Sequence, residues 1–389
     1  MDRAAGTARG QSRFTLRQVR SSAAFAAFFF AACASLGTPP GGPVDTEAPK
    51  ILKIVPDSAR TGVKPPEVVF KFDEVVSERP SGAPSLSALF LISPRDGEPR
   101  VSWHRSELTV RPRRGWRNNT AYTITMLPGL SDLRGNTRNT GAVTMFSTGP
   151  TIPTSKITGT IFNWAEGRTL ARALIEARPQ TDTTIVYVGS PDSSGTFVLP
   201  NVPPGSYLVR GISDDNSNRA LDPREAFDTA VVALTDSASI ELYAFVHDSV
   251  GTRLMSVSRK DSVTIELSFD NPIAAAPPVL PQQIRVRAQD STDVGVLSVT
   301  PPPPDTSAAA RKLHRAIPTR TLTVKLSRPL VPKTRYRIRA TDVRNLTGVA
   351  RTSEASLDVP APLAAPVPAP AGTVPPVAAP PPPPSPVKH

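Results

Sequence analysis

The segments LTVRPRRGWRNNTAYTI (108–124) and LTVKLSRPLVPKTRYRI (322–338) decide the fold of this chain of 389 residues. They align without a gap, and seven of the seventeen positions are identical. Each begins with alternating apolar and polar residues, passes through turn-forming residues and ends in a second alternating run. This pattern is typical of two β-strands joined by a loop. Its recurrence in one chain indicates two copies of one structural unit.

Two further pairs of similar segments occur in the same order in both halves of the chain. They are FKFDEVV (70–76) with LSFDNPI (267–273), and SDLRGN (131–136) with TDVRNLTG (341–348). Chance rarely places three similar segments in one order, so we expect the copies to occupy residues 46–150 and 246–359. The second copy has a longer insertion, 274–316, which contains the basic stretch RKLHR (311–315).

The first copy contains several short strands. In VVFKF (68–72) the two aromatic residues face one side and Lys71 faces the other, as in a half-buried strand. Many short strands within about a hundred residues are typical of a β-sandwich. The sequence predicts seven strands, over 50–55, 67–72, 90–93, 100–103, 108–111, 121–127 and 143–147.

A series of motifs connects the first copy to a known family. PKILKIVPDSARTGV (49–63) is followed by VVFKFDEVV, LTVRP, NNTAYTITM, LSDLRGN and the closing TMFSTG (144–149). This series is similar to bacterial Ig-like domains of the SbsA type, and the resemblance implies an Ig-like β-sandwich. Asp132, Gly135 and Asn136 predict a tight turn with positive φ before the last strand. The second copy keeps Asp342 and Asn345 but loses the Gly-Asn order.

The segment between the copies, residues 151–245, has a different pattern. GTFVLPNVPPGSYLVRGI (195–212) predicts two strands joined by a Pro/Gly turn, after the strand-like runs ITGTIFN (157–163) and ALIEARP (173–179). These motifs resemble the carboxypeptidase-regulatory or prealbumin-like β-sandwich. In such families the module is a stalk, a spacer or a sugar-binding unit. The fold class predicted for the chain is therefore all-β, with tandem Ig-like and prealbumin-like β-sandwiches.

The N-terminal segment, residues 1–32, predicts export. Five arginines precede the apolar run AAFAAFFFAA (23–32), which is a signal-peptide pattern. The run is too short for a membrane-spanning helix, which needs about 20 residues. Phe30, Ala31 and Ala32 precede Cys33, and this order resembles a bacterial lipobox, although Phe30 replaces the usual Leu. The resemblance implies cleavage by signal peptidase II and lipid on Cys33. An ordinary signal with an incidental cysteine is the alternative.

The ends of the exported chain predict disordered segments. Residues 33–45 form a Gly/Pro-rich tether, and thirteen of the last thirty residues, 360–389, are proline. Such a tail cannot bury a core and favours extended polyproline structure, as a spacer or as a cell-wall ligand. Cys33 is the only cysteine in the chain. Once Cys33 is lipidated, no thiol is left for a disulfide or for a thiolate metal site.

The charge pattern limits the partners. The formal net charge is +12, and arginine alternates with apolar residues in strand-like runs such as RYRIRA (335–340). This spacing predicts a solvated strand face, with a lipid headgroup or an acidic glycan as the alternative partner. No nucleic-acid-binding motif accompanies the charge, so we expect no nucleic-acid partner.

No catalytic pattern is visible in the sequence. The four histidines lie in different segments, and the chain contains no H-E-x-x-H, G-x-S-x-G or phosphate-binding glycine motif. We therefore expect no enzyme and no cofactor other than a structural calcium ion.

One polar stretch, DDNSNRALDPRE (214–225), has the spacing of a calcium loop. Position six is Arg219 instead of the glycine that such loops use, which adds strain and places a cation near the ion. The alternative is a structural turn, in which Asp222-Pro223-Arg224-Glu225 starts a short helix. The calcium ligands would be Asp214, Asn216, Asn218, the carbonyl of Ala220, Asp222 and Glu225.

The sequence favours two functions. The first is a non-enzymatic lipoprotein of the cell envelope, anchored through Cys33 to the outer or cytoplasmic membrane, that serves adhesion, scaffolding or protein binding. The second is a glycan-binding or hydrolase-accessory protein. Trp164 in IFNWAEG is the candidate glycan contact, and a partly buried core tryptophan is the alternative.

Overall fold

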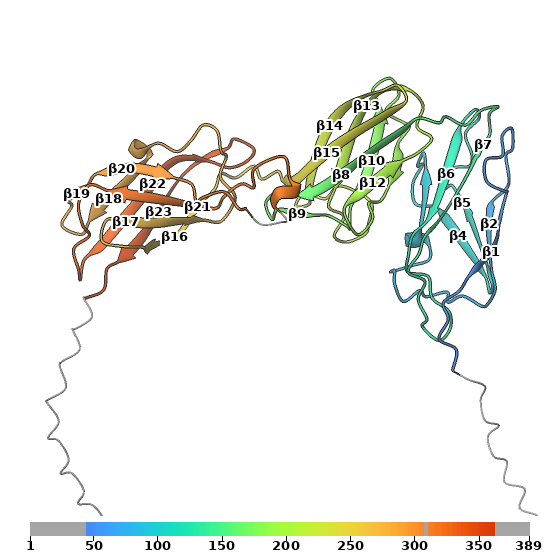
Figure 1. Ribbon diagram of the computed structural model, residues 1–389, viewed down its shortest axis with the longest axis horizontal. Helices are drawn as coiled ribbons and strands as arrows, with labels where there is room; N and C mark the ends of the chain where they lie inside the picture. Colours follow the sequence, from blue (N-terminus) through green and yellow to red (C-terminus); the bar gives the residue numbers. More distant parts are fainter. Residues whose placement is uncertain (1–43, 307–309, 362–389) are drawn as a thin grey trace, which may run out of the picture. The chain divides into compact units, whose positions relative to one another are not determined.

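The computed structural model describes residues 44–306 and 310–361 (Figure 1). Within these ranges the regular structure consists of β-strands and short 3₁₀ turns, which confirms the all-β fold class. No helix in the described residues is long and apolar enough to cross a membrane. The signal segment, the lipobox with Cys33, and most of the tether and of the Pro-rich tail lie outside the described residues.

The strands form three consecutive groups of sheets. Every described strand belongs to the compact unit that begins at Glu47. Within this unit no sheet is shared between strands of different groups. We name the groups the first module (β1–β7), the middle module (β8–β15) and the last module (β16–β23), as labelled in Figure 1.

The first module is a two-sheet sandwich. One sheet has the order β1-β2-β5-β4 and the other the order β3-β6-β7. Phe70 and Leu108 from the first sheet and Ile124 and Phe146 from the second are fully buried in one core. The strands are β1 (Ile51–Val55), β2 (Val68–Phe72), β3 (Phe90–Ser93), β4 (Arg100–His104), β5 (Glu107–Arg111), β6 (Ala121–Met126) and β7 (Ala142–Ser147). Each of the seven predicted strands forms within one residue of its expected bounds.

The middle module has a continuous strand order, β11-β10-β13-β14-β15-β8-β12, with β9 paired to β8. The pairing of β14 with β15 is confined to Ala226–Phe227 opposite Phe245–Val246, so the sheet turns there and closes over its own core. The strands are β8 (Lys156–Asn163), β9 (Arg168–Thr169), β10 (Leu174–Pro179), β11 (Tyr187–Gly189), β12 (Thr196–Leu199), β13 (Gly205–Ile212), β14 (Ala226–Leu234) and β15 (Ser237–Val246).

The last module repeats the topology of the first. Its sheets have the orders β16-β17-β21-β20 and β19-β18-β22-β23, which match the first module except for the added β19. In β22 the arginines of RYRIRA are exposed and the residues between them are buried, as the solvated-face interpretation predicts. The strands are β16 (Leu254–Arg259), β17 (Thr264–Phe269), β18 (Ile284–Ala288), β19 (Asp293–Val294), β20 (Val296–Thr300), β21 (Thr321–Leu326), β22 (Arg335–Arg344) and β23 (Ala350–Asp358).

A buried tyrosine explains part of the similarity between segments 108–124 and 322–338. The hydroxyl of Tyr122 accepts a hydrogen bond from the backbone N–H of Arg117 at 2.7 Å. The hydroxyl of Tyr336 accepts the corresponding bond from Val331 at 2.9 Å. Both donors lie five residues before the tyrosine, in the loop that enters the strand. A buried tyrosine ring needs a partner for its hydroxyl, and the repeat preserves that partner in both copies.

The turn before the last strand corrects the sequence alignment. Asp132 accepts hydrogen bonds from the backbone N–H groups two and four residues later, and Asn345 does the same. Asp132 also bridges Val76, and Asn345 bridges the matching Ile273. Asn345, and not Asp342, is therefore the counterpart of Asp132. Gly135 and Gly348 follow in equivalent positions with φ of 93° and 83°, so the second copy keeps the glycine that the positive φ requires.

Candidate functional site

The predicted calcium loop, residues 214–225, connects β13 to β14. Asp222 and Glu225 do not start a helix, so that part of the structural-turn alternative is wrong. The N–H of Asp222 nevertheless donates to Glu225 Oε2 at 2.9 Å, the bond that a capping box would make. The segment closes only a single turn, because the chain immediately enters β14 at Ala226.

The predicted ligands contact one another through hydrogen bonds within the loop. The side-chain amides of Asn216 and Asn218 donate to Asp222 Oδ2 at 2.6 and 2.8 Å. The amide oxygen of Asn218 accepts the N–H of Ala220 at 2.8 Å, and Asp214 Oδ2 accepts the N–H of Arg219 at 3.1 Å. The structure therefore brings these side chains into one small loop.

The two acids at the ends of the loop are buried. Asp214 is 9% exposed and Glu225 is 7% exposed. One oxygen of each carboxylate, Oδ1 of Asp214 and Oε1 of Glu225, is buried without a hydrogen-bond partner. Burial raises the pKa of Asp214 above its ordinary value, although backbone N–H groups of the loop act in the opposite direction. A buried carboxylate oxygen without a partner is costly, so these two atoms distinguish the loop from an ordinary turn.

Arg219 has a role that the sequence did not reveal. Its φ is 58°, so it adopts the left-handed conformation expected of position six without being glycine. Its guanidinium leaves the loop and donates to two carbonyl oxygens of the first module, Phe90 O at 2.6 Å and Ala88 O. The guanidinium therefore binds the first module, and its charge still acts on Asp214, where it lowers the pKa against the larger effect of burial.

Arg95 of the first module completes this junction from the other side. It donates to the carbonyl of Arg219 at 2.7 Å and to the carboxylate of Glu176 at 2.6 Å. Glu176 lies on β10 of the middle module and its side chain is 2% exposed. The N–H of Arg95 also donates to Val186 O at 2.7 Å. No local sequence signal identifies Arg95, because its partners are 81 to 124 residues away.

A cleft of about 850 Å³ lies at the same junction. The indole N–H of Trp116 in its wall is buried without a partner. Asp96, also in the wall, accepts the N–H groups of Arg113 and Arg114 at 3.0 and 2.6 Å. The charged residues of the wall are Arg95, Asp96, Glu98, Arg114, Arg117 and Arg219.

Trp164, the candidate glycan contact, lies under the insertion of the last module. The guanidinium carbon of Arg315 is 4.0 Å from the centre of its ring, and its indole N–H donates to Ala316 O at 2.8 Å. Leu313 packs in the same apolar cluster. The basic stretch within this insertion therefore covers the half-buried tryptophan, and a sugar would have to displace Arg315 to stack on the ring.

The described histidines do not form a catalytic group. His247 stacks on Phe227 and Phe245, with ring centres 3.8 and 4.2 Å away. His314 pairs with Glu241 at 2.6 Å. Within the described ranges no serine or threonine hydroxyl is hydrogen-bonded to a histidine.

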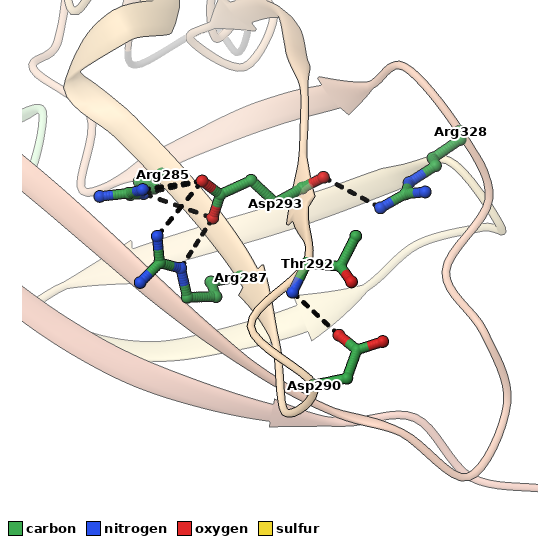
Figure 2. A network of polar contacts seen from close by, with 6 residues as sticks. All are labelled: Arg285, Arg287, Asp290, Thr292, Asp293 and Arg328. Atoms are coloured by element: carbon green, nitrogen blue, oxygen red, sulfur yellow. Dashed lines mark hydrogen bonds and ion pairs between the residues drawn. The ribbon is translucent and has the colours of Figure 1, made fainter.

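The exposed acid whose pKa is shifted most strongly, Asp293, lies in the last module (Figure 2). Asp293 pairs with Arg287 at 2.8 Å and Arg285 at 2.7 Å, and these bonds hold its pKa well below the ordinary value. Its backbone carbonyl accepts Arg328, and Asp290 accepts the N–H of Thr292 in the same hairpin. Each carboxylate in this network has a partner and lies at the surface, so the network stabilises a hairpin.

Comparison with known proteins identifies the first module. Residues 45–148 match the family model described as a bacterial Ig-like domain. This match confirms the Ig-like part of the resemblance seen in the sequence, for about a quarter of the chain. A search of curated proteins gave no match.

Solved structures give only distant likenesses. The N-terminal part of the bacterial S-layer protein SbsC is 20% identical over 28% of this chain and 24% of its own, with a TM-score of 0.21. A DUF3823 family protein from Bacteroides uniformis is 11% identical over 54% of this chain and all of its own, with a TM-score of 0.19. The Bacillus anthracis TIE protein is 11% identical over 82% of this chain and 56% of its own, with a TM-score of 0.17. The chain thus spans about a quarter of the first of these structures, and none of the three likenesses supports an argument about function.

Proposed function

We propose that the protein is a non-enzymatic lipoprotein of the cell envelope, in which the modules form a spacer between a lipid anchor at Cys33 and a protein partner. The observation that carries this proposal is that three side chains of the kinds that often bind ligands instead join neighbouring modules. Arg219, Arg95 and Trp164, which in another protein could serve a substrate, make contacts between modules. A chain that places such residues at its junctions is suited to holding its modules in place.

The anchor is tested by labelling cells with a palmitate analogue and separating membranes. The wild-type chain should be labelled and recovered with membranes, because an N-terminal cysteine carrying several acyl chains binds a bilayer stably. Cys33→Ser should lose both properties. Ser35→Ala is the matched control, since it changes the same segment and keeps the cysteine. Labelling of Cys33→Ser equal to wild type would refute the anchor.

The cleft beside Trp116 favours glycan binding as a second function. Its wall combines cationic and anionic side chains with the unpartnered indole N–H. Arg114 is exposed, and within the described residues no hydrogen bond or ion pair engages its guanidinium. Acidic sugars are bound by such combinations of arginine and hydrogen-bond donors.

A glycan array separates the two candidate sites. Loss of binding on Arg114→Ala, with binding kept on the exposed control Arg111→Ala, would assign the glycan to the cleft. Loss on Trp164→Ala would assign it to the covered tryptophan instead. Absence of binding by the wild-type chain leaves the spacer function alone.

A further inference from the structure

We infer that the loop 214–225 binds one calcium ion, and that the bound ion fixes Arg219 so that the middle module is held against the first. This inference goes beyond the spacer function and does not depend on lipid at Cys33. It rests on two buried carboxylate oxygens without partners and on the contacts of Arg219.

The two unpartnered oxygens belong to carboxylates whose other oxygen is bound within the loop. Asp214 uses its other oxygen to accept the N–H of Arg219, within the loop. Glu225 uses its other oxygen to accept the N–H of Asp222, also within the loop. The free oxygens, Oδ1 of Asp214 and Oε1 of Glu225, therefore lie at positions one and twelve of the twelve-residue segment. These are the positions that supply the first and last ligands in a calcium loop.

The remaining residues offer further oxygen atoms of the kinds that calcium binds. Calcium takes six to eight oxygen ligands, from carboxylates, amide oxygens, backbone carbonyls and water. The amide oxygens of Asn216 and Asn218 each accept one backbone N–H, at 3.0 and 2.8 Å, and an amide oxygen has a second lone pair. Asp222 adds a third carboxylate, and Ala220 offers its carbonyl.

A proton is the other way to satisfy the buried oxygens. Protonation would supply one donor to each carboxylate, which is consistent with the effect of burial on Asp214. Protonation needs no further ligand, so the calcium titration distinguishes it from metal binding. Magnesium fits less well, since it requires a rigid octahedral arrangement and keeps its water. The donor set therefore favours calcium, with the weak dissociation constant of extracellular modules, about 10⁻⁴ to 10⁻³ M.

The link to the first module passes through one residue. The N–H of Arg219 donates to Asp214, which is the first proposed ligand. The guanidinium of Arg219 donates to Ala88 O and Phe90 O, and its carbonyl accepts Arg95. An ion that orders Asp214 also orders the backbone of Arg219. The same ion thus reduces the freedom of the contact between the modules.

Calorimetric titration of the full chain carrying Cys33→Ser with calcium chloride tests the site. We expect one site with a dissociation constant between about 10⁻⁴ and 10⁻³ M, and at least tenfold weaker binding in Asp214→Asn and Glu225→Gln. Asp215→Asn is the matched control, because it removes the same charge one residue away, at an exposed position that is no ligand. Its affinity should stay within about twofold of the parent chain, because diffuse charge contributes little there.

Two results of the titration would overturn the site. One is the absence of binding heat up to about 20 mM calcium together with an unchanged melting temperature in calcium and in EDTA, since binding at these constants must raise stability. The other is an equal loss of affinity in Asp215→Asn and Asp214→Asn, which would show a diffuse charge effect. Magnesium at the same concentration should bind at least tenfold more weakly, and equal binding would contradict the proposed selectivity.

A second experiment tests the coupling separately. Cys33 is the only cysteine, so the Cys33→Ser chain accepts spin labels at Lys53→Cys in the first module and Val231→Cys in the middle module. Both positions are exposed. The distribution of distances between the labels should be narrow in calcium and broader in EDTA.

Arg219→Gly separates calcium binding by the loop from the contact that Arg219 makes with the first module. Glycine adopts the φ of 58° without strain and removes the guanidinium. This variant should bind calcium at least as tightly as the parent chain and show the broad distance distribution with and without the ion. If the distribution of label distances in the parent chain is the same in calcium and in EDTA, the coupling is overturned even if calcium binds. A distribution that still narrows in Arg219→Gly would assign the coupling to another contact.

Discussion

The acidic loop of the middle module and the acidic hairpin of the last module use carboxylates in opposite ways. Asp214 is buried, one of its oxygens has no partner, and its pKa is raised by burial. Asp293 is exposed, it pairs with two arginines, and its pKa is lowered by those bonds. Both oxygens of the Asp293 carboxylate are paired with arginines, whereas the loop has two buried carboxylate oxygens that no described residue binds. The contrast shows that burial and partners together, more than the number of acids, indicate a site.

The largest effect is expected when a paired buried acid loses its partner. Glu176 is 2% exposed and is held by Arg95 at 2.6 Å and by Arg178 at 3.1 Å. Arg95→Ala should lower the free energy of unfolding of the middle module by about 3 kcal/mol, since it leaves a buried charge short of a partner. Hydrogen exchange of the amides of β10 measures this loss. Arg178→Ala is the comparison within the module, and an equal loss there would show that the Arg95 contact across the junction contributes no more than the contact within the module.

The structure shows why the sequence predicted the strands and missed this junction. Alternation and turn residues act over a few positions, so the seven strands of the first module and the solvated arginines of β22 could be predicted. Arg95 and Arg219 make contacts more than 80 residues away, and a single sequence holds no trace of such a pairing.

In the candidate site, too, only the features set by neighbouring residues could be predicted from the sequence. The ligand spacing of the loop is local and was visible in the sequence, but the burial of Asp214 and Glu225 depends on the folded module. The alignment of Asp132 with Asp342 failed for a related reason. It matched residue types, whereas the turn requires an acceptor for two backbone N–H groups, and Asn345 supplies that acceptor.

The next largest effect should come from making a second buried acid in which one oxygen has no donor. Asn345 is 3% exposed, and its side-chain amide donates to the carbonyls of Asp248 and Val250 at 2.9 and 3.1 Å. Asn345→Asp would place a carboxylate oxygen against these carbonyls, so the last module should lose about 2 kcal/mol of unfolding free energy.

Urea denaturation followed by hydrogen exchange in the last module measures the effect of Asn345→Asp. The matched change is Asp132→Asn in the first module. It keeps an acceptor oxygen for the two backbone N–H groups of that turn and should cost less. A smaller loss for Asn345→Asp than for Asp132→Asn would contradict the cost expected for a buried carboxylate oxygen without a donor.

Asp214→Asn should have a smaller effect, and its sign should depend on calcium. In EDTA at neutral pH the variant should be more stable than the parent chain by about 1 kcal/mol, because a neutral amide replaces a buried carboxylate. A saturating concentration of calcium should reverse the order, because only the parent chain gains binding energy.

The dependence of this difference on pH follows from the raised pKa of Asp214. The folded state binds the proton more tightly than the unfolded state, so the parent chain in EDTA gains stability as the pH falls through the folded pKa toward about 3.9. The advantage of Asp214→Asn should therefore shrink over the same range. Melting curves at several pH values test this, and an advantage that grows as the pH falls would show that the carboxylate is not the cause.

Asp293→Asn should have the smallest effect, with the opposite dependence on pH. The lowered pKa of Asp293 means that the folded state binds the proton less tightly than the unfolded state. Its pairing therefore stabilises the last module at pH values above the unfolded pKa of about 3.9, and this contribution is lost as the pH falls through the folded pKa. The variant should melt slightly below the parent chain at neutral pH, and the difference should fade in acid and in high salt.

Asp290→Asn is the matched control for this hairpin, because it removes a carboxylate that accepts the backbone N–H of Thr292 and that Figure 2 shows joined to none of the arginines drawn. Its effect should be less sensitive to salt than that of Asp293→Asn, since a hydrogen bond within a turn is screened less than an exposed ion pair. Equal salt dependence in the two variants would mean that the arginines act on the hairpin as a whole. In that case the specific pairing of Asp293, and with it the contrast to the unpartnered Asp214, would have to be abandoned.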